Sequence, residues 1–378
     1  NVPQHQDIDP VTPDTLSRPP FNLDANAQSW VRETLARLTR GEKIAQTFNL
    51  RSAGYDAAEL DMQQRFRPGG ITRVPGADIE AERALRRAFN DRAPVPLLVS
   101  ADLEGSRMSL PPGTEVPNPL ALAAVDDVAA TREISRIMAE EARAAGINWS
   151  FTPVVDINAA FRSAIVATRG YGADTATIER HALAQIEAFQ AAGVAATVKH
   201  WPGEGYDDRD QHLVTTINPL SPEQWEPTFG RLYRAAIDAG VMAVMSAHIA
   251  LPAFVRERDP DAGIEAFRPA SISRVLNEEL LRDRLGFNGL IVSDATGMAG
   301  LGAWSKRSEH IPEIIANGCD VILFSARPDQ DFAFVEAALD DGRLSETRLD
   351  DAVARILGLK AALGLHRHQE PDLSVLGR

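Results

Sequence analysis

The densest group of chemically useful side chains lies in one loop, residues 199–212. It reads Lys-His-Trp-Pro-Gly-Glu-Gly-Tyr-Asp-Asp-Arg-Asp-Gln-His. Asp210 and His212 are two residues apart, so the carboxylate can hydrogen-bond the imidazole and set which ring nitrogen carries the proton. Such a pair can donate and accept a proton during catalysis. The alternative is a solvated acidic loop around Arg209, and the spacing alone leaves both interpretations open.

A second reactive group is Asp294, which directly follows the apolar run Ile291-Val292-Ser293. A carboxylate at that point can serve as a nucleophile, a general base or a metal ligand, or it can cap the next helix. The segment holds no second carboxylate, and the chain has no His-x-x-x-His spacing, so a metal site at Asp294 lacks support. Met298, four residues further on, either lines the same pocket or packs in the core.

The elements that must position these groups are predicted by hydrophobic patterning. Short runs rich in Val and Ile alternate with segments of helical period, which is typical of βα units and a parallel sheet. The chain has about 340 residues of this pattern without a long linker, which favours an α/β fold with a single (β/α)₈ TIM-type barrel over a doubly wound sheet. The expected strands are residues 47–50, 70–74, 95–101, 147–155, 195–199, 242–246, 289–293 and 320–325.

Polar side chains follow the ends of several expected strands. In a barrel of parallel strands, the loops at the carboxyl ends build the site, whereas core positions are mostly aliphatic. A clustered set of charges at one end therefore indicates a binding or catalytic site, with a structural ring of ion pairs as the alternative. The set comprises Asp102, Glu104, Asp156, Asn158, Arg169, Lys199, His200, His248 and Asp294.

The two ends of the chain differ from the rest. Residues 1–26 are rich in proline and have no helical or alternating period, which predicts an irregular, extended N-terminal arm. Residues 27–365 form the expected catalytic domain. Residues 366–378 form a short C-terminal tail, after which we expect no second domain.

Composition excludes several classes of protein. Hydrophobic residues make up 44% and charged residues 24% of the 378 residues, which are globular values. The net charge of −14 opposes binding to nucleic acid. No apolar run is long enough for a membrane span. Cys319 is the single cysteine, so neither an intramolecular disulfide nor a thiolate metal site can form.

Motifs for cofactors and for serine nucleophiles are also missing. No Gly-x-Gly-x-x-Gly follows the first expected strand, and neither a phosphate-loop Gly-Lys-Ser/Thr nor Gly-x-Ser-x-Gly occurs. Dinucleotide and nucleotide binding therefore lack support. The sequence carries no signal for the oligomeric state.

The loop itself resembles a known family. Lys-His-Trp-Pro-Gly-Glu-Gly, four residues, then Asp-Gln-His is similar to the signature loop of glycoside hydrolase family 3, in its bacterial β-N-acetylglucosaminidase branch. Ordered supporting motifs extend the resemblance over residues 38–363. They are Leu-Thr-Arg-Gly-Glu-Lys-Ile-Ala-Gln from residue 38, Gly-Gly-Ile from 69, Asp-Leu-Glu-Gly-Ser-Arg from 102, Pro-Val-Val-Asp-Ile-Asn from 153, Arg-Gly-Tyr-Gly from 169, Met-Ser-Ala-His from 245 and Ser-Asp from 293.

The resemblance implies a barrel, a retaining mechanism through a covalent glycosyl-enzyme, and no cofactor. By its motifs Asp294 matches the nucleophile, and His212, oriented by Asp210, matches the general acid/base in place of the second carboxylate of most retaining glycosidases. The positions that hold the sugar hydroxyls are matched by Asp102, Arg169, Lys199 and His200. The implied activity is that of an exo-acting β-N-acetylhexosaminidase with a carbohydrate substrate. Because the loop bears glycines, we expect it to open and close over the site.

Departures from the family pattern keep other functions open. Glu204, Ser106, Leu110 and the Thr296-Gly297 pair each differ from the residues common in that branch, which bears on the identity of the sugar. The alternatives are a β-glucosidase or another β-glycosidase, a β-glycoside phosphorylase, and a non-catalytic sugar-binding barrel. The proline-bearing arm and the missing initiator methionine favour a periplasmic or secreted location over a cytoplasmic one.

Overall fold

A computed structural model describes residues 13–163 and 165–367, and its centre is made of parallel strands. One sheet has the order β10-β1-β2-β3-β4 and a second has the order β5-β7-β9, and every pair in them is parallel. Their bounds are β1 Phe48–Ser52, β2 Gly70–Arg73, β3 Leu98–Ala101, β4 Trp149–Ser150, β5 Thr197–Trp201, β7 Ala243–Ser246, β9 Leu290–Ser293 and β10 Ile322–Leu323.

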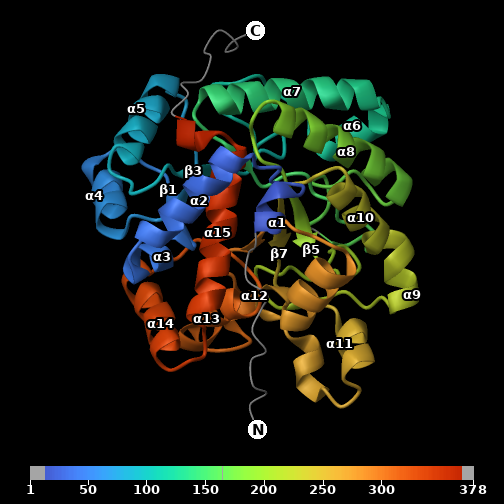
Figure 1. Cartoon of the computed structure of the whole chain (residues 1–378). Helices are drawn as coiled ribbons and strands as arrows, with labels where there is room; N and C mark the ends of the chain where they lie inside the picture. The colour runs from blue at the N-terminus through green and yellow to red at the C-terminus, as the bar shows by residue number, and fades with distance from the viewer. Residues whose placement is uncertain (1–12, 164, 368–378) are drawn as a thin grey trace.

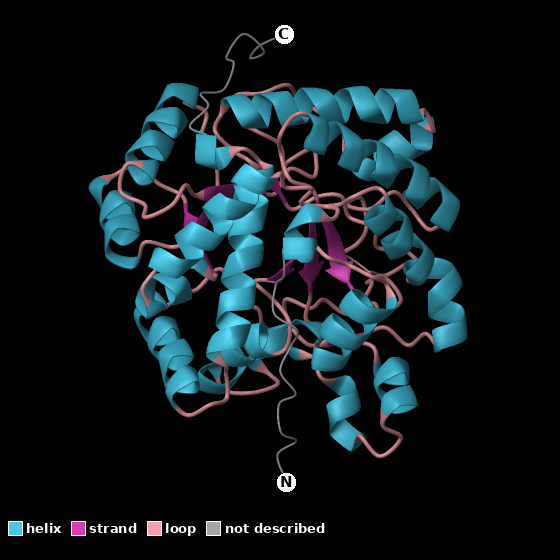
Figure 2. Cartoon of the chain, in the orientation of Figure 1, coloured by secondary structure: helices cyan, strands magenta, loops and turns pink. Residues whose placement is uncertain are grey.

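Isolated parallel bridges join the two sheets at both edges. Trp149 pairs with Ala195 between β4 and β5, and Val292 pairs with Val321 between β9 and β10. The strands therefore follow one another in chain order around the centre, with helices outside them (Figure 2). This is an α/β fold with a parallel sheet, and it is consistent with a TIM-like barrel. A further short pair, β6 Thr216–Ile217 with β8 Ile249–Ala250, lies in the loops that follow β5 and β7.

The strands lie where the apolar runs predict them, and most of them are shorter than expected. Central strand positions such as Val198, Val244 and Ile291 are fully buried, as expected for strands covered on both faces. The expected strand over residues 147–155 is wrong in length, because only Trp149–Ser150 is regular. Pro153 has no N–H to donate, so the chain continues by irregular pairing with the segment beside it.

Helices connect and cover the strands (Figure 1). Several begin at an aspartate that accepts a hydrogen bond from the first turn, which satisfies donors the helix leaves unpaired. The helices are α2 Ala25–Arg37, α3 Arg40–Gln46, α4 Ala57–Phe66, α5 Ile79–Asn90, α6 Pro119–Val125, α7 Val128–Ala144, α8 Thr175–Ala191, α9 Pro222–Trp225, α10 Arg231–Asp238, α11 Pro252–Arg258, α12 Ala299–Gly302, α13 Arg307–Ala316, α14 Pro328–Asp340 and α15 Glu346–Ala362, with a π-helical turn η1 Glu226–Gly230, a π-helix η4 Val275–Arg284, and 3₁₀ turns η2 Gly263–Phe267, η3 Ala270–Ile272 and η5 Leu365–Arg367.

The expected extended arm is wrong for part of its length. Pro13–Ser17 form a short helix, α1, and α2 begins at Ala25. Proline is compatible with the first helical position, and Leu16 and Phe21 are buried against Gly358 of α15. Apolar side chains therefore hold this segment on the domain. Residues 1–12 of the arm and 368–378 of the tail lie outside the described residues.

Long apolar helices are not found in the described part of the chain. No helix there has both the length and the hydropathy that a membrane crossing requires. This agrees with the absence of a long apolar run in the sequence.

Candidate active site

The carboxyl ends of the parallel strands bring most of the expected site residues together. Lys199 and His200 belong to β5, and Asp102 follows β3 directly. Asp294 follows β9 directly. Parallel strands present these ends at the same edge of the fold, so groups far apart in sequence share one site.

Four charged side chains form a hydrogen-bonded cluster. The Nζ of Lys199 lies 2.9 Å from Asp102 Oδ1 and 2.6 Å from Glu104 Oε1. Arg169 donates to Glu104 through Nε and Nη2, both at 2.8 Å. Burial alone would raise the pKa of Glu104, but the charges of Lys199 and Arg169 hold that pKa well below its usual value. Asp102 is the accessible acid of the cluster, with a side chain 34% exposed.

The acid partners also keep Lys199 charged. Its side chain is only 2% exposed. Burial lowers the pKa of an ammonium, but Asp102 and Glu104 more than offset this and raise the pKa of Lys199 overall. The cluster can therefore present a fixed cation and an accessible carboxylate, a combination that can bind sugar hydroxyls.

His200 is fixed by a buried acid. Its Nδ1 lies 2.6 Å from Asp156 Oδ2, and its backbone N–H donates to Asp156 Oδ1 at 3.1 Å. The other ring nitrogen, Nε2, lies 3.5 Å from Nη2 of Arg169. Asp156 therefore orients the imidazole toward the charged cluster.

Asp294 is a buried carboxylate held in its ionised form. Its Oδ1 accepts a hydrogen bond from the Ala295 N–H at 2.7 Å. Burial raises the pKa of Asp294, but His200, His248 and this backbone N–H outweigh it and lower the pKa. The side chain caps no helix, because α12 begins only at Ala299. A desolvated, ionised carboxylate suits a nucleophile.

Asp210 and His212 form the hydrogen-bonded pair that their spacing allows. The Oδ1 of Asp210 lies 2.7 Å from His212 Nδ1 and accepts from the His212 N–H at 2.8 Å. Burial raises the pKa of Asp210, but the hydrogen bonds from His212 lower it overall. With Nδ1 engaged, Nε2 of His212 is the nitrogen available for proton transfer, and its side chain is 52% exposed.

The end of the 199–212 loop is hydrogen-bonded to the segment that follows Asp294. The Ala299 N–H donates to the His212 carbonyl at 3.0 Å, and the Gly300 N–H donates to the Gln211 carbonyl at 3.1 Å. The structure thus holds the loop against the segment that follows Asp294. Opening and closing of the loop stays a prediction.

The sequence predicts only part of the set of side chains that hold the site together. The sequence places Glu104, Asp156 and His248 at strand ends without specific partners, and it gives Gln211 no role beyond its place in the signature loop. His248 is buried, with Nδ1 2.8 Å from Ser271 Oγ and Nε2 2.9 Å from the Ala295 carbonyl. Met298 is buried at the start of α12, beside the segment that carries Asp294.

One group of side chains lies close enough to suggest a metal. Donor atoms of Asp156, His200 and Glu204 all lie within 4.8 Å of one another. Both Asp156 oxygens already accept hydrogen bonds, from the Nδ1 and the N–H of His200, and Gln211 donates to Glu204. Hydrogen bonding therefore accounts for this cluster, and we assign no metal ligand.

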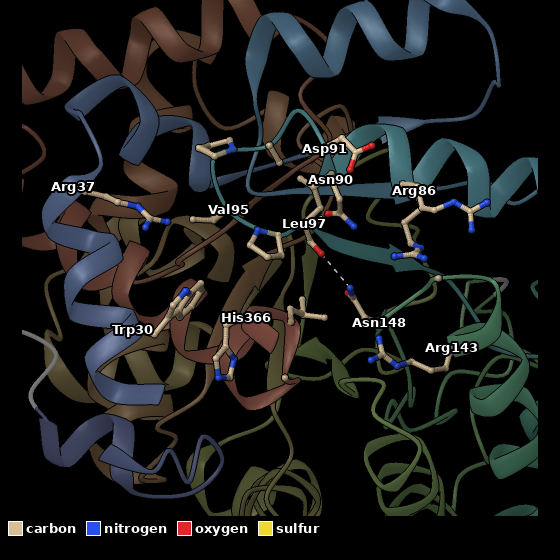
Figure 3. Close-up of a pocket in the computed structure, with 17 residues that line it drawn as sticks. Trp30, Arg37, Arg86, Asn90, Asp91, Val95, Leu97, Arg143, Asn148 and His366 are labelled. Atoms are coloured by element: carbon tan, nitrogen blue, oxygen red, sulfur yellow. Dashed lines mark hydrogen bonds between the residues drawn. The ribbon is translucent and has the colours of Figure 1, made fainter. Parts of the chain in front are cut away.

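A separate cavity of about 570 Å³ lies at the opposite end of the strands (Figure 3). Val95, Leu97 and Asn148, just before β3 and β4, line it, with Arg86 and Arg143 at its side. The expected site residues do not line this cavity, since they follow the other ends of the same strands.

Known proteins are similar to this chain over most of its length. Residues 62–359 match the profile described as glycosyl hydrolase family 3 N terminal domain. A beta-N-acetylglucosaminidase/beta-glucosidase of Cellulomonas fimi is 45% identical over 354 residues, which are 93% of this chain and 63% of that protein. A beta-hexosaminidase of Methylobacillus flagellatus is 30% identical over 62% of this chain and 66% of its own length.

Solved structures give the same picture. The beta-glucoside phosphorylase BglX, bound to 2FGlc, has a TM-score of 0.93 and 36% identity over 96% of this chain and 66% of that chain. A glycoside hydrolase family 3 beta-N-acetylglucosaminidase of Paenibacillus has a TM-score of 0.80 and 31% identity over 89% of this chain and 65% of that chain. The chain thus spans slightly less than two thirds of the length of these relatives.

Proposed function

The chain belongs to glycosyl hydrolase family 3, and from that premise we propose that it is a retaining exo-β-glycosidase that releases terminal β-linked N-acetylglucosamine. The proposal places the site on a single (β/α)₈ barrel. The observation that carries it is the 2.7 Å contact between Asp210 and His212, which leaves Nε2 of a half-exposed histidine free for proton transfer. The hexosaminidase and N-acetylglucosaminidase names of several relatives support the choice of sugar.

The reaction proceeds in two steps. In the first, the Asp294 carboxylate attacks the anomeric carbon while protonated His212 gives its Nε2 proton to the departing glycosidic oxygen. The glycosidic bond breaks and an ester forms on Asp294. In the second, neutral His212 takes a proton from water, the water oxygen attacks the anomeric carbon, and Asp294 leaves as a carboxylate.

The charged cluster positions the sugar. Asp102 accepts hydrogen bonds from sugar hydroxyls, Lys199 donates to them, and His200 hydrogen-bonds a further hydroxyl. Arg169 is engaged by Glu104, so its role is to fix that acid and present the remaining N–H groups toward His200. Contacts that strengthen as positive charge develops on the sugar ring lower the activation free energy of the reaction. Met298 forms part of the apolar wall beside Asp294.

Phosphorolysis is the second candidate. A β-glucoside phosphorylase is 36% identical to this chain, and a neutral histidine repels an incoming phosphate less than a carboxylate would. Burial raises the pKa of Glu204 well above its usual value, and Asp156 and Asp294 raise it further, so this acid adds little negative charge at the site. In that reaction phosphate oxygen replaces water in the second step.

The test is release of aryl alcohol from a panel of aryl β-glycosides, measured with and without phosphate. We expect turnover of the N-acetylglucosaminide, and loss of turnover in the Asp294→Ala variant. If only the glucoside is turned over, the substrate in the proposal changes from a β-linked N-acetylglucosaminide to a β-glucoside. A sugar 1-phosphate product would favour the phosphorylase. No turnover of any glycoside under either condition would refute both and favour a sugar-binding barrel.

A further inference from the structure

We propose that Glu204 and Gln211 are positioning residues that hold His212, at the end of the 199–212 loop, in its catalytic place. This inference rests on the proposed function, because it assigns them a role in proton transfer through His212. Neither residue touches the reacting atoms in the proposed mechanism. Both connect the loop to the strand-end segments that carry the other site residues.

Gln211 is the buried anchor between half-buried Asp210 and exposed His212. It is 1% exposed, whereas the His212 side chain is 52% exposed. Its Nε2 donates to Glu204 Oε2 at 2.9 Å, and its Oε1 accepts from the His248 N–H at 3.0 Å. Both the NH₂ and the carbonyl oxygen of the amide therefore have hydrogen-bond partners. These bonds fix the end of the loop to its own start after β5 and to the segment after β7.

The Gln211 backbone ties the loop to a third segment. Its carbonyl accepts from the Gly300 N–H at 3.1 Å, in α12 after Asp294. The neighbouring His212 carbonyl accepts from the Ala299 N–H at 3.0 Å. A group held by the start of its own loop and by the segments after β7 and β9 has little freedom to shift, which is what proton transfer over a hydrogen-bond distance requires.

Glu204 is itself held rigidly. Its N–H donates to Asp156 Oδ1 at 3.0 Å, and its carbonyl accepts from the Ile157 N–H at 3.1 Å. The next residue, Gly205, has φ of +115°, and a Cβ there would lie 1.8 Å from the Ile157 carbonyl oxygen. Only glycine allows this close approach of the two backbones. The backbone of Glu204 is thereby fixed near the start of the loop.

The chemistry of a neutral acid fits this role. Glu204 is buried, and the groups that face it are Asp156, His200, Asp294, Arg169, Gln211 and Thr216. Burial, Asp156 and Asp294 raise its pKa, against the opposing effects of Gln211 and Arg169. A protonated Glu204 can hold the Gln211 amide without placing a second negative charge beside the nucleophile.

The experiment compares Glu204→Ala with Glu204→Gln, using aryl glycosides with good and poor leaving groups. Departure of a poor leaving group needs the proton from His212, whereas dinitrophenolate leaves without it. For Glu204→Ala we expect kcat/KM to fall about tenfold for the phenyl glycoside and less than about threefold for the dinitrophenyl glycoside. Azide, which attacks without a general base, should restore kcat on the dinitrophenyl glycoside. The isosteric Glu204→Gln should keep the phenyl activity within about threefold.

Glu141→Ala serves as the matched control for loss of a buried carboxylate. Glu141 lies on α7 away from the site and accepts from the N–H and Oγ1 of Thr114, both at 2.7 Å. It should not change the ratio of the two activities. Equal losses on both glycosides in Glu204→Ala, without azide rescue, would overturn the proposal. Where that variant does not fold, Gln211→Leu is read by the same two criteria. A wild-type protein inactive on every glycoside would instead refute the proposed function.

Discussion

Replacing Gly300 by alanine should displace Gln211 and, with it, His212 at the end of the 199–212 loop. A Cβ at this position would lie 2.3 Å from the Gln211 carbonyl oxygen, 3.1 Å from the Val214 carbonyl oxygen and 3.2 Å from His248 Cβ. Real Cβ contacts are at least 3.0 Å, so the Gln211 carbonyl has to move by about 0.7 Å. That movement would also stretch its hydrogen bond from the Gly300 N–H.

The size of the effect follows from this displacement. A misplacement of about 1 Å in a catalytic group can cost about 100-fold in rate. For a shift of about 0.7 Å at the residue before His212, we expect about a tenfold fall in kcat/KM on a phenyl glycoside, equivalent to about 1.4 kcal/mol. The inhibition constant for the free sugar should stay within about threefold, because Lys199 and Asp102 are not displaced.

The assay uses initial rates on phenyl and dinitrophenyl glycosides, with Gly302→Ala as the control. Gly302 lies in the same short helix, α12, and a Cβ there meets no atom within 4 Å. The control should behave as wild type in both activity and melting temperature. The reasoning is wrong if Gly300→Ala and Gly302→Ala have the same rates, or if Gly300→Ala loses activity equally on both glycosides.

Three further predictions concern charges. Asp210→Asn should lower kcat/KM for the phenyl glycoside about tenfold or more, because an amide cannot stabilise the imidazolium, while thermal melting stays unchanged; a change in melting of several degrees would contradict it. Lys199→Met leaves buried Glu104 with Arg169 alone, so urea unfolding should show a loss of about 3 kcal/mol and KM should rise; unchanged values of both would contradict it. Burial lowers the pKa of Lys360 to about 7, so between pH 7 and its ordinary value of 10.5 the unfolded chain binds more protons and stability rises with pH. Lys360→Met should raise the melting temperature at pH 7 by several degrees and flatten this rise, as calorimetry at pH 7 and 9 would test.

The strand positions and several site residues could be predicted from local sequence. A buried parallel strand needs a short, nearly continuous apolar run, and such runs mark β5, β7 and β9 within a few residues. Asp294 and Lys199 follow from their positions at the ends of those runs. The Asp210 and His212 pair is equally local, because both side chains belong to one turn of the loop.

Contacts between distant segments could not be predicted in this way. Glu104 and Arg169 are 65 residues apart, and His248 and Gln211 are 37 apart. Which acid a cation meets depends on how the strands are ordered around the centre, and no local pattern encodes that order. The helix at Pro13–Ser17 has the same origin, because tertiary burial of Leu16 and Phe21 outweighs a proline-rich composition.

The sequence by itself determined the repeated βα units, the strand ends that carry charge, and the family to which the signature loop points. The tertiary structure alone decided that Arg169 is paired with Glu104, that Glu204 is buried beside Asp156, and that Gln211 hydrogen-bonds Glu204 and the His248 N–H. The physical reason is burial. An exposed and a buried glutamate are the same letter in the sequence, and only packing removes the water that separates their charges from those of their neighbours.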